Sequence, residues 1–108
     1  MNFSLIVCTY MRPKALTDLL DSVKLQTNYP DQIIIVDGST NTKTKEVLSN
    51  ESYENLRYYL VDENERGLTK QRNFGIAKVT SDSEVIAFVD DDTKLSKNYF
   101  KVLIDTFK

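Results

Sequence analysis

The 108-residue chain has no histidine, one cysteine, three glycines and two prolines. Without histidine, imidazole cannot act as a general acid or base, and no zinc ion can be held through imidazole nitrogens. Any metal site must therefore use oxygen ligands. No apolar run approaches the roughly 20 residues that a transmembrane helix needs. The sequence therefore predicts no transmembrane segment in this chain.

The single cysteine, Cys8, lies in the apolar run Leu5–Cys8. This position is typical of a small core side chain in a reducing compartment, and we do not expect a nucleophile there. The formal net charge of −2 disfavours a broad nucleic-acid-binding surface, which would be basic. We expect the protein to be cytoplasmic or, within a longer protein, peripheral at the cytoplasmic face of the membrane.

Apolar, β-branched runs alternate with helical patterns along the chain. The runs that predict strands cover residues 3–9, 33–36, 56–61 and 84–89, and the last is apolar enough to predict burial on both faces. The helical patterns cover residues 13–24, 43–48 and 68–79, and a fourth follows Ser96 as its cap. In the third helix, Leu68, Arg72, Gly75, Ile76 and Val79 share one side. This alternation predicts an α/β fold, a mostly parallel sheet with helices on both faces, similar to half of a nucleotide-binding domain.

Polar side chains follow three of the expected strands. Thr9, Tyr10 and Arg12 follow the first strand, Asp37 ends the second, and Asp90–Asp92 follow the fourth. Ligands of open α/β sheets bind outside the carboxyl ends of the strands. Three adjacent carboxylates repel one another, so a fold that fixes them together has a cation or hydrogen-bond donors nearby. The alternative is a solvated acidic turn that opens the next helix.

The chain has no glycine loop that would hold phosphates. Neither G-x-G-x-x-G after the first strand nor G-x-x-x-x-G-K-[ST] is present. A diphosphate therefore needs another source of positive charge, and a divalent cation held by the acidic triplet would supply it. Asp37 is placed to accept hydrogen bonds from a ribose or a base, as acids do in dinucleotide-binding folds.

Four segments together resemble glycosyltransferase family 2, an inverting family with the GT-A fold. The segments are Ser4–Arg12 (SLIVCTYMR), Ile35–Thr40 (IVDGST), Asn64–Asn73 (NERGLTKQRN) and Phe88–Asp92 (FVDDD). They follow the family's order and approximate spacing over essentially the whole chain. The resemblance implies that residues 1–108 form the Rossmann-like, nucleotide-sugar-binding (donor) half of a GT-A domain, with the acceptor-binding half absent from this chain.

The resemblance also implies roles for the residues after the first two strands. Thr9 and Tyr10 would line the pocket for the base, with Arg12 near it. Asp37 would hydrogen-bond the uracil or other base. The family usually has two acids before Gly-Ser at this point, whereas Val36 precedes Asp37 here. The base contact would therefore rest on one residue.

The acidic triplet receives two different roles from the resemblance. Asp90 and Asp91 would reach the ribose, and Asp92 would bind Mn²⁺ or Mg²⁺ bridging the diphosphate. Arg72 would face the nucleotide, or would be a solvated helix arginine. The family's catalytic base belongs to the acceptor-binding half, so no catalytic residue is expected in this chain and the base is expected beyond Lys108.

The implied enzyme is a metal-dependent transferase. It would move a sugar from a nucleoside-diphosphate sugar, with a UDP-sugar favoured, to a hydroxyl of a polysaccharide, lipid or protein glycan. The 108-residue chain is expected to bind the nucleotide and to be inactive alone.

Two other interpretations use the same residues. The segment Phe88–Thr93 fits the h-h-D-x-D-x-[TV] pattern of haloacid-dehalogenase-like phosphohydrolases, in which Asp90 would be the nucleophile and Asp92 its partner. That motif belongs on the first strand of its own fold, whereas it follows the fourth strand here. A non-catalytic α/β nucleotide-binding module is the other interpretation.

Overall fold

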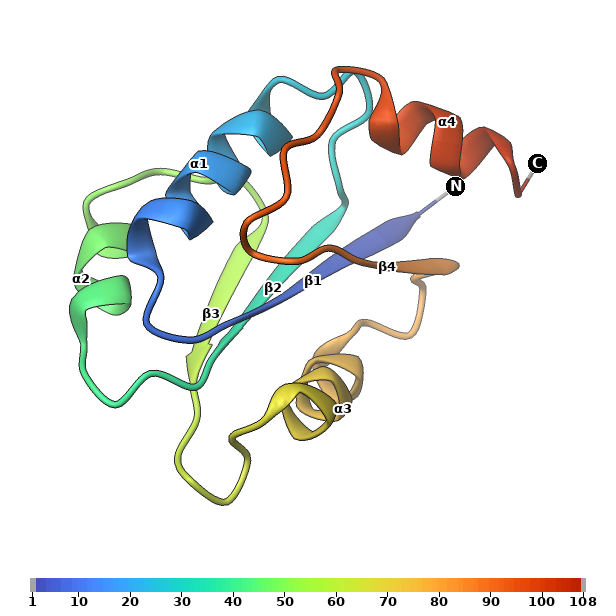
Figure 1. Ribbon diagram of the computed structural model, residues 1–108. Helices are drawn as coiled ribbons and strands as arrows, with labels where there is room; N and C mark the ends of the chain where they lie inside the picture. Colours follow the sequence, from blue (N-terminus) through green and yellow to red (C-terminus); the bar gives the residue numbers. More distant parts are fainter. Residues whose placement is uncertain (1, 108) are drawn as a thin grey trace.

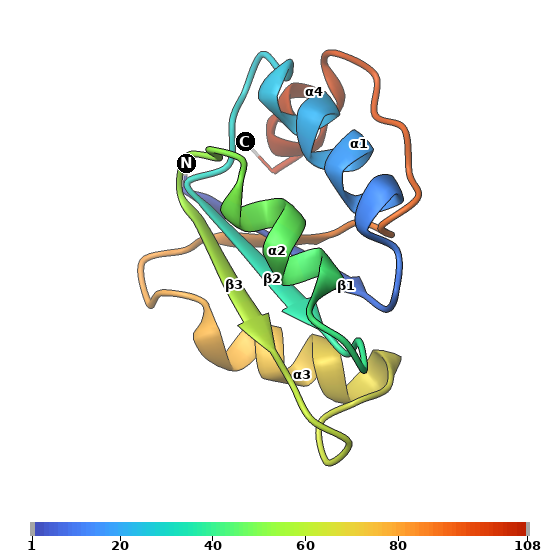
Figure 2. The same ribbon diagram turned by 90° about the vertical axis from the view of Figure 1, so that its left-hand side faces the viewer.

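A parallel four-stranded sheet lies at the centre of the molecule, in the strand order β3-β2-β1-β4. The computed structural model describes residues 2–107. In chain order the elements are β1 (Phe3–Thr9), α1 (Pro13–Lys24), β2 (Gln32–Asp37), α2 (Lys43–Ser49), β3 (Leu56–Leu60), α3 (Leu68–Lys78), β4 (Val85–Phe88) and α4 (Tyr99–Asp105). Helices α1, α2 and α4 lie on one side of the sheet and α3 on the other (Figures 1 and 2). The predicted α/β fold with a parallel sheet covered on both faces is confirmed.

The larger core fills the space between the sheet and α1, α2 and α4. Alternate residues of the central strands point to this side, among them Phe3, Leu5 and Val7 of β1, which are fully buried. Helix α1 contributes four buried side chains at helical spacing, Leu16, Leu19, Leu20 and Val23. A smaller cluster on the α3 side is formed by Ile6, Ile34, Val36 and Val61. The central strands are thus held on both faces, which fixes the positions of their carboxyl ends.

Helix α4 does not begin as the sequence predicted. Ser96 does not cap it, because the helix starts at Tyr99 and the Ser96 carbonyl instead accepts hydrogen bonds from the Tyr99 amide (3.1 Å) and from Nε2 of Gln26 (2.6 Å). The same Gln26 side chain accepts a hydrogen bond from the Phe100 amide through Oε1, at 3.0 Å. A side chain that follows α1 therefore satisfies the start of α4.

Strand β4 is less buried than the sequence predicted. Ala87 is 7% exposed, but Ile86 and Phe88 are 37% and 40% exposed. The reason is its position, because among the described residues β4 pairs with β1 alone and forms an edge of the sheet. The expectation that this strand is buried on both faces was wrong.

Helix α3 faces the sheet with a side that only partly matches the one predicted. Gly75 is buried and Val79 packs against the smaller cluster, as that side requires. Leu68 and Ile76 are instead 56% and 44% exposed, and Gln71 is buried. A Cβ atom on Gly75 would lie 2.8 Å from Cγ2 of Ile6, so the glycine allows the helix to approach β1 closely. None of the helices within residues 2–107 has the length and apolarity to cross a membrane.

Candidate functional site

A cavity of about 580 Å³ opens at the carboxyl edge of the sheet. It is lined by Cys8–Tyr10, Arg12, Arg66–Leu68, Gln71 and Asp90–Asp92. The structure therefore brings together six of the eight residues that the sequence predicted for the site. The two predicted residues that do not line this cavity are Asp37 and Arg72.

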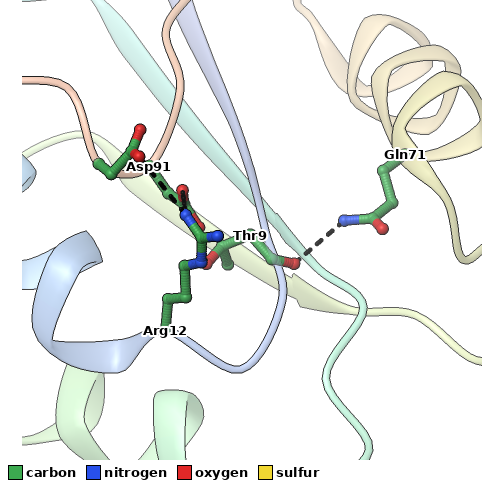
Figure 3. A network of polar contacts seen from close by, with 5 residues as sticks. Thr9, Arg12, Gln71 and Asp91 are labelled. Carbon is green, nitrogen blue, oxygen red and sulfur yellow. Dashed lines mark hydrogen bonds and ion pairs between the residues drawn. The ribbon is translucent and has the colours of Figure 1, made fainter.

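A buried hydrogen bond joins the acidic triplet to the end of β1. The Thr9 hydroxyl donates to Oδ2 of Asp91 at 2.9 Å, and the two residues are only 3% and 8% exposed (Figure 3). A hydrogen bond to a carboxylate is stronger than one between neutral groups. This contact therefore fixes the β4–α4 loop beside β1 and leaves Asp90 and Asp92 exposed at the cavity.

Arg12 supplies positive charge next to the triplet. Its Nη1 atom lies 3.4 Å from Oδ1 of Asp91 and 3.5 Å from Oδ2 of Asp92. The Arg12 and Asp92 side chains are 57% and 64% exposed, so water screens their interaction. Asp92 is thus weakly held by the protein and accessible to a ligand.

A tight turn between β1 and α1 presents Tyr10 and Arg12 at the cavity. Met11 has a positive φ of 55°, and its amide donates to the Ser39 hydroxyl at 2.8 Å. Pro13 then begins α1, where the missing amide proton is not needed. Tyr10 is 50% exposed, so its ring is available to a ligand.

Asp37 is fully buried, and both of its carboxylate oxygens already accept hydrogen bonds. Oδ1 accepts from the Ser39 amide (2.9 Å) and hydroxyl, and Oδ2 accepts from the Tyr58 hydroxyl. Burial, and then the bond to Asp37, raises the pKa of Tyr58. Because Ser39 also holds Met11, Asp37 supports the β1–α1 turn from behind. Its contact with a base stays a prediction.

Arg72 lies on the exposed side of α3. Its guanidinium carbon is 5.5 Å from the centre of the Phe88 ring, a cation–π contact at the edge strand. Its predicted role toward the nucleotide stays a prediction. Burial raises the pKa of the nearby Cys8 thiol to about 11, and the charge of Arg72 partly opposes this shift. The thiol is therefore protonated near neutral pH, which agrees with the expectation that it is not a nucleophile.

Sequence reasoning missed Arg66 and Gln71, although both lie in the segment Asn64–Asn73. Nε of Arg66 donates to the Gly38 carbonyl, and Gln71 bonds to the ends of β1 and β2. The available signal was helical spacing, because Gln71 precedes the sheet-facing Gly75 by one turn. A polar residue on that face at the first turn meets the carboxyl ends of the strands.

The carboxylate oxygens at the cavity suit a divalent cation that also binds a diphosphate. Asp90 and Asp92 offer exposed carboxylate oxygens, and hard cations such as Mg²⁺ and Mn²⁺ prefer oxygen ligands. Within the described residues no group of three or more acidic, histidine or cysteine side chains forms a complete metal site. Mg²⁺ typically binds through one or two carboxylates together with substrate phosphates and water. The residues present match that mode.

The fold and the site define an α/β nucleotide-binding class in which acidic side chains take the place of a glycine-rich phosphate loop. The family model described as Glycosyl transferase family 2 matches residues 4–108. The chain belongs to this family. The phosphohydrolase interpretation is not favoured.

Two characterised relatives by sequence come from bacteria. The O-antigen chain rhamnosyltransferase RfbN of Salmonella typhimurium is 31% identical over 96 residues, which cover 89% of this chain and 30% of RfbN. The poly(ribitol-phosphate) beta-N-acetylglucosaminyltransferase TarS of Staphylococcus aureus is 32% identical over 107 residues, covering 94% of this chain and 18% of TarS. The chain thus spans less than a third of either relative.

Solved structures show the same fold. The crystal structure of S. aureus TarS 1–349 in complex with UDP-GlcNAc has a TM-score of 0.77 at 31% identity, covering 99% of this chain and 30% of that one. The mannosyltransferase PcManGT of Pyrobaculum calidifontis, in complex with GDP-Man and Mn²⁺, has a TM-score of 0.68 at 26% identity, covering 84% and 27%. These neighbours are GT-A glycosyltransferases, so the predicted Rossmann-like part of a GT-A fold is confirmed.

Proposed function

We propose that this chain is the donor-binding part of an inverting glycosyltransferase that uses a nucleoside-diphosphate sugar, in particular a UDP-sugar. One observation carries the proposal. Thr9, Arg12 and the Asp90–Asp92 triplet line a single cavity at the carboxyl edge of the sheet, where ligands of such folds bind. The bound UDP-GlcNAc and GDP-Man of the two solved neighbours support it.

We propose that different side chains of the cavity contact the base, the ribose and the diphosphate. Thr9 and Tyr10 face the base, and the exposed Asp90 reaches the ribose. Asp91 borders the ribose while it holds the loop through Thr9. The resemblance places Arg12 near the base, but its guanidinium lies 3.5 Å from Asp92, so we propose that it lies at the phosphate side.

Asp92 is the residue that would hold a divalent cation, with Mn²⁺ and Mg²⁺ as the candidates. A divalent metal is part of this family's chemistry, since the mannosyltransferase neighbour contains Mn²⁺. When bound, the cation supplies positive charge that stabilises the departing diphosphate. Asp92 is suited to this role because its carboxylate is exposed and only weakly paired with Arg12.

The proposed reaction is a displacement at the anomeric carbon. The oxygen of the acceptor hydroxyl forms a bond to that carbon while the bond to the diphosphate oxygen breaks, and the diphosphate leaves with the electron pair. We further propose that the base that takes the hydroxyl proton is supplied by residues outside 1–108. The acceptor would be a polysaccharide, a lipid or a protein glycan.

Calorimetric titration with UDP tests the proposal. We expect UDP to bind in the presence of MnCl₂, and we expect Asp92→Asn to weaken this binding at least tenfold, which corresponds to about 1.4 kcal/mol. Asp82→Asn is the matched control, because Asp82 is an exposed acid that lines a different cavity. A parallel titration with GDP measures the base preference.

Three results would count against the proposal. They are the absence of UDP and GDP binding, binding that is indifferent to the metal, and equal losses in Asp92→Asn and Asp82→Asn.

A further inference from the structure

Both the nitrogen and the oxygen of the Gln71 side-chain amide form hydrogen bonds within the protein. It lies in the first turn of α3 and is 5% exposed. Its Nε2 atom donates to the carbonyl of Val36 at 2.9 Å and to the carbonyl of Thr9 at 3.2 Å, and its Oε1 atom accepts from the Gly67 amide at 3.1 Å (Figure 3 shows the contact with Thr9). One amide therefore links three separate parts of the backbone.

Two of these parts line the candidate site, and the third lies next to it at the end of β2. Thr9 ends β1 and leads into the turn that carries Tyr10 and Arg12, and Gly67 immediately precedes α3 at the cavity. Val36 immediately precedes Asp37, which supports that turn. The side chain of Thr9 in turn holds the acidic loop. Gln71 thus affects the shape of the cavity through the backbone groups with which it forms hydrogen bonds.

The β2–α2 loop leaves room for this amide. A Cβ atom on Gly38 would lie 2.7 Å from Oε1 of Gln71 and 3.1 Å from Cγ of Arg66. The Gly38 amide donates to the same Thr9 carbonyl at 3.0 Å, and its carbonyl accepts from Nε of Arg66. The loop, Arg66 and Gln71 are therefore packed as one unit at the wall of the cavity.

We propose that Gln71 is a positioning residue for nucleotide binding, which fixes the spacing between the ends of β1 and β2 and the start of α3. This inference rests on the proposed function, because it concerns the same cavity. Removal of the Gln71 amide takes a donor from the Val36 and Thr9 carbonyls and the acceptor from the Gly67 amide, while the Thr9 carbonyl keeps the Gly38 amide. Buried polar groups that lose hydrogen bonds favour rearrangement of the backbone that carries them. The cavity then loses the arrangement that suits the nucleotide, even though the fold persists.

The test compares two substitutions on the same face of α3. Gln71→Met keeps an unbranched side chain of similar size and removes both donors and the acceptor. Phe74→Leu is the matched control, because the Phe74 ring packs against the Tyr59 ring, with 5.5 Å between their centres, and does not line the cavity. The substitution therefore weakens the packing of α3 and leaves the three backbone contacts of Gln71 in place. Melting temperature, and the Kd for UDP with MnCl₂ well below that temperature, are measured for both variants and the wild type.

We expect Gln71→Met to raise the Kd at least tenfold and Phe74→Leu to leave it within twofold, at comparable losses in melting temperature. We also expect the Gly67 amide proton to shift in the nuclear magnetic resonance spectrum of Gln71→Met, because it loses its acceptor. If Gln71→Met does not fold, Gln71→Leu replaces it, since it also removes both donors and the acceptor and is a shorter apolar side chain that favours the helix.

The outcomes separate the inference from the proposed function. If the wild type binds UDP and both variants bind it equally well, or equally poorly, the positioning role is overturned while the proposed function stands. If the wild type binds neither UDP nor GDP, the proposed function fails and the inference fails with it.

Discussion

The hydrogen bond between Thr9 and Asp91 is the contact that orders the acidic loop, and Thr9→Val removes it with little change in shape. Both side chains are β-branched and of similar size, so packing at the end of β1 is retained. Asp91 then loses a buried donor that lies 2.9 Å away. Among residues 2–107, Asp91 keeps the contact with Arg12, at 3.4 Å and on a side chain that is 57% exposed.

The expected change in the free energy of unfolding depends on how buried each contact is. A hydrogen bond to a charged group contributes about 1.5–3 kcal/mol, and an exposed ion pair contributes about 0–1 kcal/mol. We therefore expect Thr9→Val to lower the free energy of unfolding by about 2 kcal/mol. We expect Arg12→Ala to lower it by less than about 1 kcal/mol, because water screens the guanidinium.

Urea unfolding at neutral pH measures these differences from the shift in midpoint at constant slope. Thr17→Val is the matched control, since the Thr17 hydroxyl donates only to the Lys14 carbonyl at the exposed surface of α1. If Thr9→Val lowers the free energy of unfolding no more than Thr17→Val does, the hydrogen bond between Thr9 and Asp91 does not order the acidic loop. A cost for Arg12→Ala above that of Thr9→Val would show that the ion pair orders the loop.

Two further predictions concern Cys8 and Tyr58. The pKa of Cys8 is about 11, against an ordinary 9.0, so its alkylation by iodoacetamide at pH 8 should be about 100-fold slower than that of a free thiol. The alkylation rate should keep rising up to pH 11. A plateau of the rate near pH 9 would contradict this prediction. Tyr58→Phe removes a donor from the buried Asp37 and should lower the free energy of unfolding in urea by about 1–3 kcal/mol. Tyr53→Phe should lower it less, because the Tyr53 hydroxyl donates to the exposed Asp21. Equal losses in the two variants would contradict this prediction.

The sequence predicted the fold because the alternation of apolar strands and helices leaves few topologies. It also predicted most of the site, because residues after parallel strands meet at one edge of the sheet. Thr9, Arg12 and the Asp90–Asp92 triplet meet for that reason. The exposure of Phe88 was missed, since an apolar run does not reveal whether its strand lies at the centre or at the edge.

Contacts between distant side chains could not be predicted in this way. The burial of Asp37 depends on Tyr58, which arrives from the neighbouring strand, and the start of α4 depends on Gln26. The position of Gln71 follows from the close approach of α3 at Gly75, which is a property of packing. Each of these features depends on how the helices and strands pack together in three dimensions.

The central claim is that a metal and a nucleotide bind together at the Asp90–Asp92 end of the sheet. Paramagnetic broadening by MnCl₂ in the presence of UDP, followed in ¹H–¹⁵N spectra of the protein, tests it directly. We expect broadening that centres on Asp92 and includes Thr9, and that requires UDP for its full extent. Broadening centred instead on Asp31 and Asp82, the acids that line the cavity with Asn2 and Gln32, would contradict it.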